Sequence, residues 1–423
     1  MSSWFAEYAL TPAGLQRDVL FSVDGGQFSE VQPGSESGGA DRLPGIVLPG
    51  FANAHSHAFH RALRGRSGTV GDFWSWRRQM YELAGRLDPD SYYRLATAVY
   101  AEMVLAGFTT VGEFHYLHHG PGGRRYDDPR EMGNALETAA AEAGIGLVLL
   151  DTLYLAGGLG PDGHTPPDEI QRRFVDTGVA EWAERAGSAL AVHSVRAVPA
   201  QQLHEVRDIA GDRPLHVHLS EQPAENAAAQ AFYGRTPTEL LAAAGLLGPK
   251  TTAVHATHLS ATDIAELGST RICLCPTTER DLADGIGPAG ALASRGCPLA
   301  LGTDQHSLID PFEEARGLEM HERLATGRRG NFTTGQLLNA LTNHACLGID
   351  GGGALEIGAR ADLVAVRLDS VRTAGIDPAQ VLLAASVADV DTVLVGGDPV
   401  VRDGRHRLGD IPARLNSAIG ELT

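Results

Sequence analysis

Eight short apolar runs alternate with longer helical patterns through the middle of the chain, and this alternation most constrains how the chain can fold. The runs are rich in β-branched residues and bounded by Gly or Pro, as buried strands are. They cover residues 45–51, 109–117, 146–154, 189–195, 214–221, 251–259, 270–279 and 298–306, and helical patterns such as 88–107, 129–144 and 237–245 lie between them. The pattern predicts βαβ units with a parallel sheet. Eight strands favour a closed (β/α)8 barrel, and an open doubly wound sheet is the alternative.

Both chain ends are β-rich and predict a second, smaller unit. Residues 1–44 contain short alternating segments and a Gly/Ser loop, and residues 354–404 contain two β-rich runs with glycine turns. The chain is longer than the roughly 250 residues of a typical barrel, which leaves room for this unit. We expect an α/β protein in which a TIM-like barrel over residues 48–350 lies beside a small β-sandwich domain built from residues 1–47 and 351–423.

Charge and composition narrow the partners and the compartment. The 52 acidic and 34 basic side chains give a net charge of −18, which argues against binding to nucleic acid or to an anionic membrane surface. The chain begins without a basic leader and has no apolar run of about 18 residues. The four cysteines form no C-x-x-C pair and are expected to be free thiols. We therefore expect a cytoplasmic protein with a small-molecule partner.

Histidines and acids gather at the carboxyl ends of the predicted strands. They are His55 and His57, then Glu113, His115 and Tyr116, then His193 and Arg196, then His216, His218 and Glu221, then His255 and His258, and finally Asp304 and His306. In a barrel these strand ends form one face, and active sites lie on that face. Histidines that merely filled the core would be scattered along the strands. The common position of these histidines and acids at the carboxyl ends of the strands therefore predicts a metal-dependent enzyme.

The residue types suggest how such a site would work. In a strand, residues i and i+2 project to one face, so the imidazoles of His55 and His57 can point the same way. The predicted metal ligands are His55, His57, His218 and Asp304, which leave a position for water. A bound metal lowers the pKa of that water, and Asp304 is placed to take its proton. Glu221 would carry the proton to a leaving nitrogen, and His255 would stabilise the oxygen of the tetrahedral intermediate.

Several of these residues have other readings. Glu221 could instead cap the helix that begins near Pro223. His216 and His258 are expected to support the ligands or to pack, and Cys273 and Cys275 to be buried strand residues. The roles of His115, His118, His119 and His306 are left open.

Motifs from the whole chain resemble the amidohydrolase superfamily. "PGFANAHSH", "HVHLSE", "VHATHLS" and "LGTDQHS" match its strand motifs, and "GARADLVAV" followed by "VLVGGDPVVRDGR" matches its C-terminal β-domain. Within the superfamily, "HSHAFHRALRGR", "FWSWRRQMY", "GFTTVGEFHYLHH" and "LADGIGPA" are similar to the formimidoylglutamate deiminase family. That resemblance implies hydrolysis of N-formimidoyl-L-glutamate to N-formyl-L-glutamate and ammonia, a step of histidine degradation, by a homodimer.

The resemblance also implies a residue set. It implies the same metal ligands, with Glu221 as the acid/base and His255 beside the metal. The implied substrate contacts are Arg77, Tyr116, His193 and Arg196, and arginine forks suit the two carboxylates of a glutamate substrate. The chain departs from the family at His60, where Gln is usual, and at Asp281, where Asn is usual. Both positions could lie near the substrate, so His60 joins the candidate substrate-binding residues.

Two rival functions and the metal count depend on specific residues. Another deaminase, acting on a guanine- or cytosine-like ring, would have less use for Arg77, Tyr116 and Arg196. A non-catalytic homologue would be expected to lose a ligand or the acid/base, and none is missing. Two-metal members of the superfamily commonly carry a carboxylated lysine after strand 4, but the single lysine, Lys250, precedes the run 251–259. We therefore expect one divalent ion per chain, zinc, with iron as the alternative.

Overall fold

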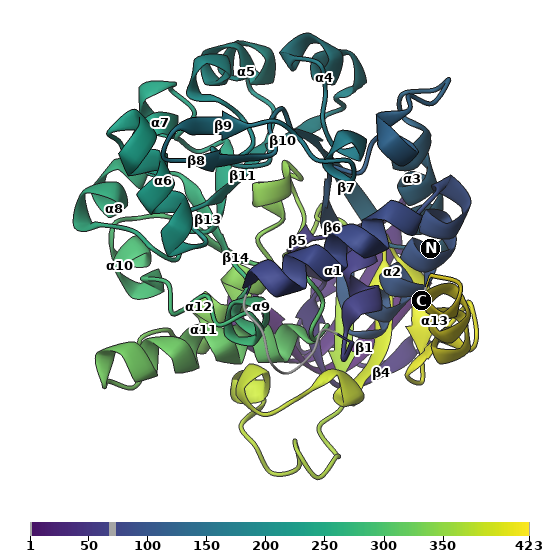
Figure 1. Cartoon of the computed structure of the whole chain (residues 1–423). Helices are drawn as coiled ribbons and strands as arrows, with labels where there is room; N and C mark the ends of the chain where they lie inside the picture. Colours follow the sequence, from purple (N-terminus) through teal and green to yellow (C-terminus); the bar gives the residue numbers. More distant parts are fainter. Residues whose placement is uncertain (1, 67–72, 423) are drawn as a thin grey trace.

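The computed structural model describes residues 2–66 and 73–422, and the main body of this part of the chain is a barrel (Figure 1). Eight parallel strands of these described residues pair in one sheet, in the order β14-β13-β12-β11-β10-β7-β6-β5. They are β5 (Phe51–Ser56), β6 (Phe108–His115), β7 (Gly146–Leu153), β10 (Ala189–Val192), β11 (Leu215–Leu219), β12 (Thr251–His255), β13 (Arg271–Leu274) and β14 (Leu299–Leu301). The predicted (β/α)8 barrel is confirmed.

The barrel closes where its first and last strands meet. Ser56 and Asp304 form a parallel β-bridge between the two strand ends. The amide nitrogens of Thr303 and Asp304 donate hydrogen bonds to the carbonyl oxygen of His55, at 3.1 and 3.0 Å. We call this junction the seam.

The prediction that residues 45–51 form the first strand of the barrel was wrong. These residues fall mainly in β4 (Asp41–Pro49), which pairs with β1 and β15 outside the barrel, and the first barrel strand is β5, which contains His55. Only Gly50 separates β4 from β5, and a Cβ built there would lie 2.4 Å from the Thr109 hydroxyl oxygen. Because the apolar run continues through both strands, its period could not reveal the change of sheet.

Helices lie around the barrel, and α1 (Phe73–Arg86) crosses in front of it in the view of Figure 1. They are α1 (Phe73–Arg86), α2 (Pro89–Leu105), α3 (Glu131–Ala143), α4 (Val179–Arg185), α5 (Leu203–Ala210), α6 (Pro223–Tyr233), α7 (Pro237–Ala243), α8 (Ala261–Leu267), α9 (Pro276–Asp281), α10 (Ala289–Ser294), α11 (Pro311–Thr326), α12 (Thr334–Leu341) and α13 (Ile411–Gly420). Several begin at side-chain caps: Asp88 before α2, Thr236 before α7 and Ser260 before α8 each accept a hydrogen bond from an amide in the first turn. A small hairpin, β8 (Gly158–Gly160) and β9 (Gly163–Thr165), follows β7.

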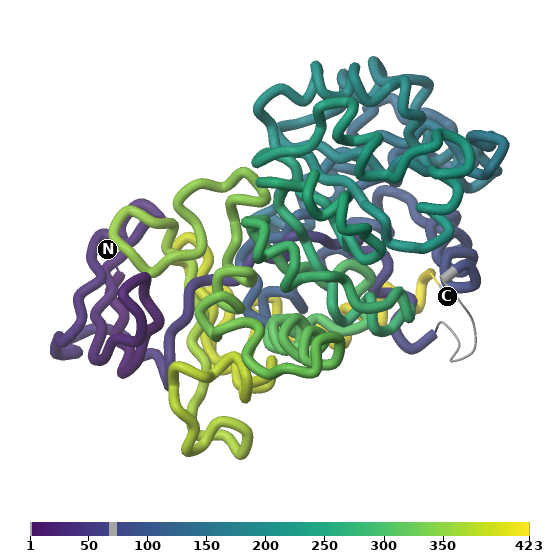
Figure 2. The backbone as a smooth tube through the Cα atoms, turned by 90° about the vertical axis from the view of Figure 1, so that its left-hand side faces the viewer, coloured from purple at the N-terminus to yellow at the C-terminus, as the bar shows by residue number. Residues whose placement is uncertain are grey.

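The two chain ends form a second, β-rich unit, as predicted for the small β-sandwich domain, and its strands pair in one mixed sheet. Its strands, in the order β18-β17-β16-β15-β4-β1-β2-β3, are β1 (Ser2–Thr11), β2 (Gly14–Asp24), β3 (Gln27–Gln32), β4, β15 (Leu363–Val366), β16 (Val390–Val395), β17 (Asp398–Arg402) and β18 (Arg405–His406). Figure 2 shows these purple and yellow segments side by side, apart from the teal half of the barrel. The residue boundaries predicted for the two units stay predictions, and their outermost residues, Met1 and Thr423, lie outside the described residues.

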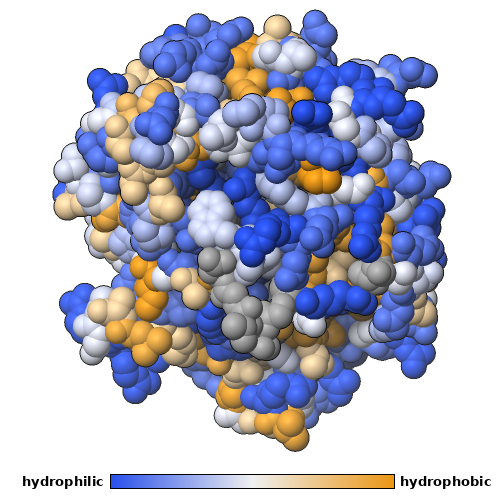
Figure 3. Space-filling model, in the orientation of Figure 1, coloured by the Kyte–Doolittle hydropathy of each residue, from blue (hydrophilic) through white to orange (hydrophobic). Residues whose placement is uncertain are grey.

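The surface is mainly hydrophilic on the face shown in Figure 3. An apolar patch lies at the lower left, over the free end of α11, where Leu324 is 78% exposed. None of the helices formed by the described residues combines the length and the apolar character that a membrane span requires.

Candidate metal centre and substrate pocket

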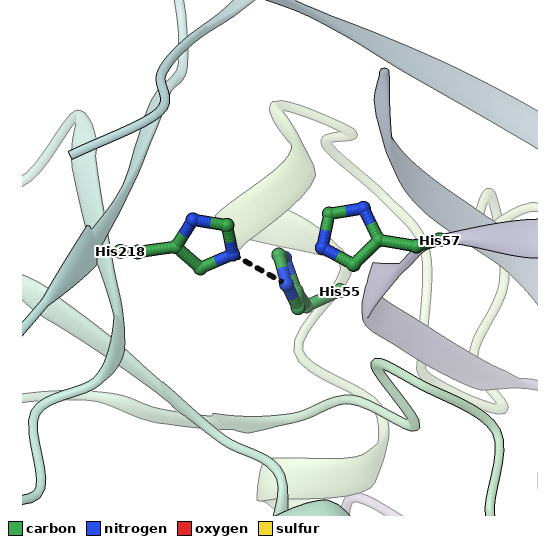
Figure 4. Close-up of side chains that lie close together, drawn as sticks. All are labelled: His55, His57 and His218. Atoms are coloured by element: carbon green, nitrogen blue, oxygen red, sulfur yellow. Dashed lines mark hydrogen bonds between the residues drawn. The ribbon is translucent and has the colours of Figure 1, made fainter. Parts of the chain in front are cut away.

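Three histidines converge at the carboxyl end of the barrel (Figure 4). His55 lies in β5, His57 directly follows it and His218 lies in β11, and the rings approach one another with their nitrogens facing inward. The Nε2 atoms of His55 and His218 are 3.1 Å apart. One nitrogen from each of the three lies within 4.8 Å of the others. All three side chains are buried.

Asp304, just beyond β14, adds a carboxylate to this cluster. Its Oδ1 lies 3.4 Å from Nε2 of His55 and 3.5 Å from Nε2 of His57. Asp304 holds this position with a backbone φ of 42°, in the left-handed region that a non-glycine residue adopts at a cost. The structure thus brings together all four predicted ligands.

The donor set fits a divalent metal. The outer ring nitrogen of His57 faces the carbonyl oxygen of Phe114 at 2.9 Å, and that of His218 faces the carbonyl of His193 at 2.8 Å, so the inner nitrogens remain free for a ligand. Burial lowers the pKa of His57 to about 3 and holds the pKa values of His55 and His218 well below their usual range. Neutral imidazoles of this kind are the form that binds metal.

Glu221 and His255 lie beside the ligands. Oε1 of Glu221 is 3.8 Å from Nε2 of His255, and that nitrogen is 4.0 Å from Oδ2 of Asp304. The other ring nitrogen of His255 lies 3.5 Å from Glu279. Burial lowers the pKa of His255, but the carboxylates of Glu221, Glu279 and Asp304 together outweigh it and raise this pKa to about 10.

Glu221 does not cap the following helix. The N-cap of α6 is Gln222, and no side chain caps it. The Glu221 carboxylate instead accepts a hydrogen bond from Arg196 at 3.1 Å. Glu225, a fully enclosed carboxylate in the first turn of α6, accepts from the Glu221 amide at 3.2 Å. Sequence reasoning missed both: Glu225 lies in the helix α6, and Glu279, the last residue of the predicted run 270–279, lies in the helix α9.

One pocket contains all of the predicted site residues except His55. Its lining comprises His57, His60, Trp76, Arg77, Met80, Tyr81, Tyr116, Tyr154, Phe174, His193, Arg196, His218, Glu221, His255, Leu282 and Asp304. Aromatic and apolar groups supply much of the wall, and the charged groups are few, as in pockets for small molecules. The structure thus places Arg77 and Arg196 in the same pocket as His57, His218 and Asp304.

Two tyrosines of this wall were not predicted. Tyr81 and Tyr154 both accept a hydrogen bond from the side-chain amide of Gln171, at 3.1 and 3.2 Å. The guanidinium of Arg77 lies over the ring of Tyr81, 4.9 Å from its centroid. These contacts hold Arg77 against an aromatic wall. Of the two tyrosines, only Tyr154 had a signal in the sequence, because it is the last residue of the predicted run 146–154.

The two departures from the family lie in different places. His60 lines the pocket, and its Nε2 is 3.0 Å from the Tyr116 hydroxyl. Asp281 is exposed, stays outside the lining and accepts a hydrogen bond from Gln305 at 2.8 Å. The expectation that both could lie near the substrate therefore fits His60, whereas only Leu282, the neighbour of Asp281, reaches the pocket.

The remaining candidates have structural partners. His216 faces the carbonyl oxygen of Cys346 at 2.9 Å, and His258 faces that of Asp284 at 2.8 Å. His118 and His119 lie 4.0 and 3.9 Å from carboxylates that a buried arginine, Arg185, already pairs. His115 packs on the His118 ring. His306 belongs to the seam, and the four cysteines are buried and free.

Comparison with known proteins places this site in a family. The amidohydrolase family matches residues 46–400, and the domain described as formimidoylglutamate deiminase HutF, N-terminal domain, matches residues 1–45. The chain belongs to the amidohydrolase family. It is 37% identical to the formimidoylglutamate deiminase of Pseudomonas aeruginosa, and the alignment covers 100% of both chains. The predicted resemblance is confirmed, and the protein is a hydrolase of carbon–nitrogen bonds.

Solved structures support the same fold. A crystal structure of an amidohydrolase from Brucella melitensis matches with a TM-score of 0.91, 32% identity and coverage of 100% of both chains. An adenosine deaminase from Xanthomonas campestris, crystallised with bound zinc, matches with a TM-score of 0.83 and 24% identity over 99% of this chain and 97% of that one. The amidohydrolase family is metal-dependent, in agreement with the histidine cluster.

Proposed function

We propose that this protein is a formimidoylglutamate deiminase, which hydrolyses N-formimidoyl-L-glutamate to N-formyl-L-glutamate and ammonia. The observation that carries the proposal is that one pocket holds a hydrolytic cluster, Glu221, His255 and Asp304, together with two arginines, Arg77 and Arg196. In an amidine substrate with two carboxylates, the amidine would face the hydrolytic cluster and the carboxylates would face the two arginines. Similarity to a deiminase of this name over the full chain supports it.

The proposed metal ligands are His55, His57, His218 and Asp304, which would hold one divalent ion, zinc, with iron as the alternative. When bound, such an ion supplies a Lewis acid that makes hydroxide available near neutral pH. A second ion would need another anionic bridge. Lys250 is exposed at the amino-terminal end of β12, at the opposite end of the strand from His255.

Two side chains would transfer the protons, and a third would stabilise the oxygen. Hydrolysis adds water across the amidine carbon, breaks its bond to the terminal nitrogen and delivers two protons to the departing ammonia. Asp304 would accept the first proton, and Glu221 would carry protons to the nitrogen. His255, held between Glu221 and Glu279, would donate a hydrogen bond to the oxygen on the reacting carbon.

The proposed substrate-binding residues are His60, Arg77, Tyr116, His193 and Arg196. Guanidinium groups bind carboxylates through paired hydrogen bonds. The pKa of Arg196 is raised, because the nearby carboxylates of Glu225 and Glu221 outweigh the effect of burial. Burial raises the pKa of Tyr116 well above its usual range, so its hydroxyl stays a neutral donor.

We extend the proposal to the setting of the enzyme: a cytoplasmic homodimer that serves histidine degradation and has no nucleic-acid or membrane partner. The buried free cysteines suit a reducing compartment, and the net charge of −18 disfavours polyanions.

Ammonia release from a panel of compounds tests the function. The panel contains N-formimidoyl-L-glutamate, N-formimidoyl-L-aspartate, N-formimidoylglycine, guanine and cytosine. We expect the highest kcat/KM with formimidoylglutamate, and the His55→Ala variant serves as the metal-deficient control. A higher kcat/KM with guanine or cytosine would favour the rival ring deaminase.

A further inference from the structure

The proposed metal ligands lie on both sides of the barrel seam. His55 lies in β5, His57 directly follows it, and Asp304 follows β14. Any slip between these two strand ends would move the Asp304 carboxylate relative to the two imidazoles. Asp304 and His306 both have a positive backbone φ, 42° and 60°, which is strained for residues other than glycine. Such backbone persists only where surrounding contacts determine it. Contacts with neighbouring residues must therefore hold this side of the seam.

A buried chain of hydrogen bonds crosses the seam beneath the ligands. The carboxylate of Glu113, on β6, accepts from the Ser56 hydroxyl at 2.6 Å and from the Ala58 amide at 2.7 Å. The Ser56 oxygen lies 3.1 Å from Nε2 of His306. The other nitrogen of His306 lies 2.9 Å from the Thr303 hydroxyl.

The chain has one consistent direction. The Ser56 hydroxyl has a single proton, which it donates to Glu113, so it accepts from Nε2 of His306. With the ring proton on Nε2, Nδ1 of His306 accepts from the Thr303 hydroxyl, which itself accepts from Asn53 at 2.6 Å. Each polar atom in the path has a partner, and Glu113 is the acceptor at its end.

We propose that Glu113 and His306 are positioning residues, which hold the two sides of the seam so that His57 and Asp304 meet one metal ion. Glu113 acts through Ser56 and Ala58, the residues on either side of His57. His306 acts through Thr303, the residue before Asp304. This inference rests on the metal site proposed above and assigns a function to two buried residues that the proposed chemistry does not use.

The test is the zinc affinity of the metal-free protein, measured by competition with a chromophoric chelator. In Glu113→Gln one of the two acceptor oxygens becomes an NH2 donor, so the side chain can no longer accept from both the Ser56 hydroxyl and the Ala58 amide. We expect zinc binding to weaken about 10- to 100-fold, as for other residues that orient metal ligands. Ser56→Ala, which removes one oxygen, should weaken binding in the same direction and serves if Glu113→Gln does not fold.

Glu314 offers a matched control. It is also a buried glutamate, and it accepts from one amide and one hydroxyl, both of Thr277. Glu314→Gln should lower the thermal midpoint of the metal-free protein as Glu113→Gln does, but should leave zinc affinity within about twofold of wild type. A purely structural role for Glu113 predicts that the two variants behave alike in both measurements.

A double-mutant cycle distinguishes a connected chain from separate contacts. If Glu113 acts through Ser56, adding Ser56→Ala to Glu113→Gln should weaken zinc binding much less than it does in the wild-type background. Wild-type zinc affinity in both single variants would overturn the inference while leaving the metal site intact. The proposed metal site, and this inference with it, would instead be refuted if the wild-type protein bound no zinc. It would also be refuted if the His55→Ala variant bound zinc as tightly as wild type.

Discussion

Arg196 donates a hydrogen bond to the carboxylate of Glu221 over 3.1 Å. This contact joins the residue proposed to bind a substrate carboxylate to the residue proposed to move protons. Glu225 lies 4.0 Å from the same guanidinium, so Arg196 is held between two buried acids. Binding of a substrate carboxylate to Arg196 would therefore change the surroundings of Glu221.

Replacement of Arg196 by methionine should impair turnover of formimidoylglutamate. A hydrogen bond to a charged group contributes about 1.5–3 kcal/mol, which corresponds to roughly 10- to 150-fold in kcat/KM. We expect at least that loss in Arg196→Met with metal content unchanged, measured by ammonia release and elemental analysis. The exposed Arg235→Met variant is the control. An unchanged kcat/KM would remove Arg196 from substrate binding.

Glu221→Gln should retain the metal and bind substrate but lose most of kcat. The amide keeps the shape of the side chain and cannot carry a proton, and general acid/base groups contribute about 10²–10⁴-fold. Steady-state kinetics and a binding measurement on zinc-loaded protein test this. Near-normal kcat in that protein would show that Glu221 has only a structural role, through its contacts with Arg196 and Glu225.

Active protein should contain one tightly bound divalent ion per chain. The proposed ligands, three histidines and Asp304, would hold one ion, and Lys250 lies at the opposite end of its strand from His255. Elemental analysis after gel filtration measures the count, and Lys250→Arg should leave it unchanged. Two ions per chain, both needed for activity, would contradict this prediction.

The two departures from the family, His60 and Asp281, should not change the preference for a glutamate over an aspartate substrate. His60 contacts the Tyr116 hydroxyl and Asp281 contacts Gln305, whereas the proposed carboxylate ligands Arg77 and Arg196 are unaltered. We expect wild type, His60→Gln and Asp281→Asn all to prefer formimidoylglutamate over formimidoylaspartate in kcat/KM. A preference of wild type for the aspartate analogue that His60→Gln reverses would show instead that His60 sets specificity.

Arg185→Met should destabilise the barrel without touching the pocket. Arg185 is buried between Asp151 and Asp176, with hydrogen bonds of 2.7–3.1 Å to both. Its removal leaves two buried carboxylates unpaired, and breaking such a buried pair costs about 3–5 kcal/mol. Denaturant unfolding measures the loss. The exposed Arg367, which pairs with exposed Asp369, offers the control Arg367→Met, which should unfold near the wild-type midpoint.

Much of the architecture and of the pocket could be predicted from the sequence, because both follow from local periodicity. Short apolar runs between helices lead to a parallel barrel, and such a barrel places every carboxyl strand end on one face. His57, His218, His255 and Asp304 gather for that reason. The spacing of His55 and His57 made them neighbours on one side of β5, whatever the rest of the chain does.

Only the tertiary structure decided which strand begins the barrel and which side chains meet across it. The Pro49-Gly50 pair marks a turn, but it does not show that the chain changes sheet there, because the strands with which β4 and β5 pair lie far away in the sequence. The contacts of Arg196 with Glu221, Ser56 with Glu113 and Ser56 with His306 join residues 25, 57 and 250 positions apart. Pairings at such separations depend on strand register, barrel closure and side-chain rotamers, which no local pattern encodes.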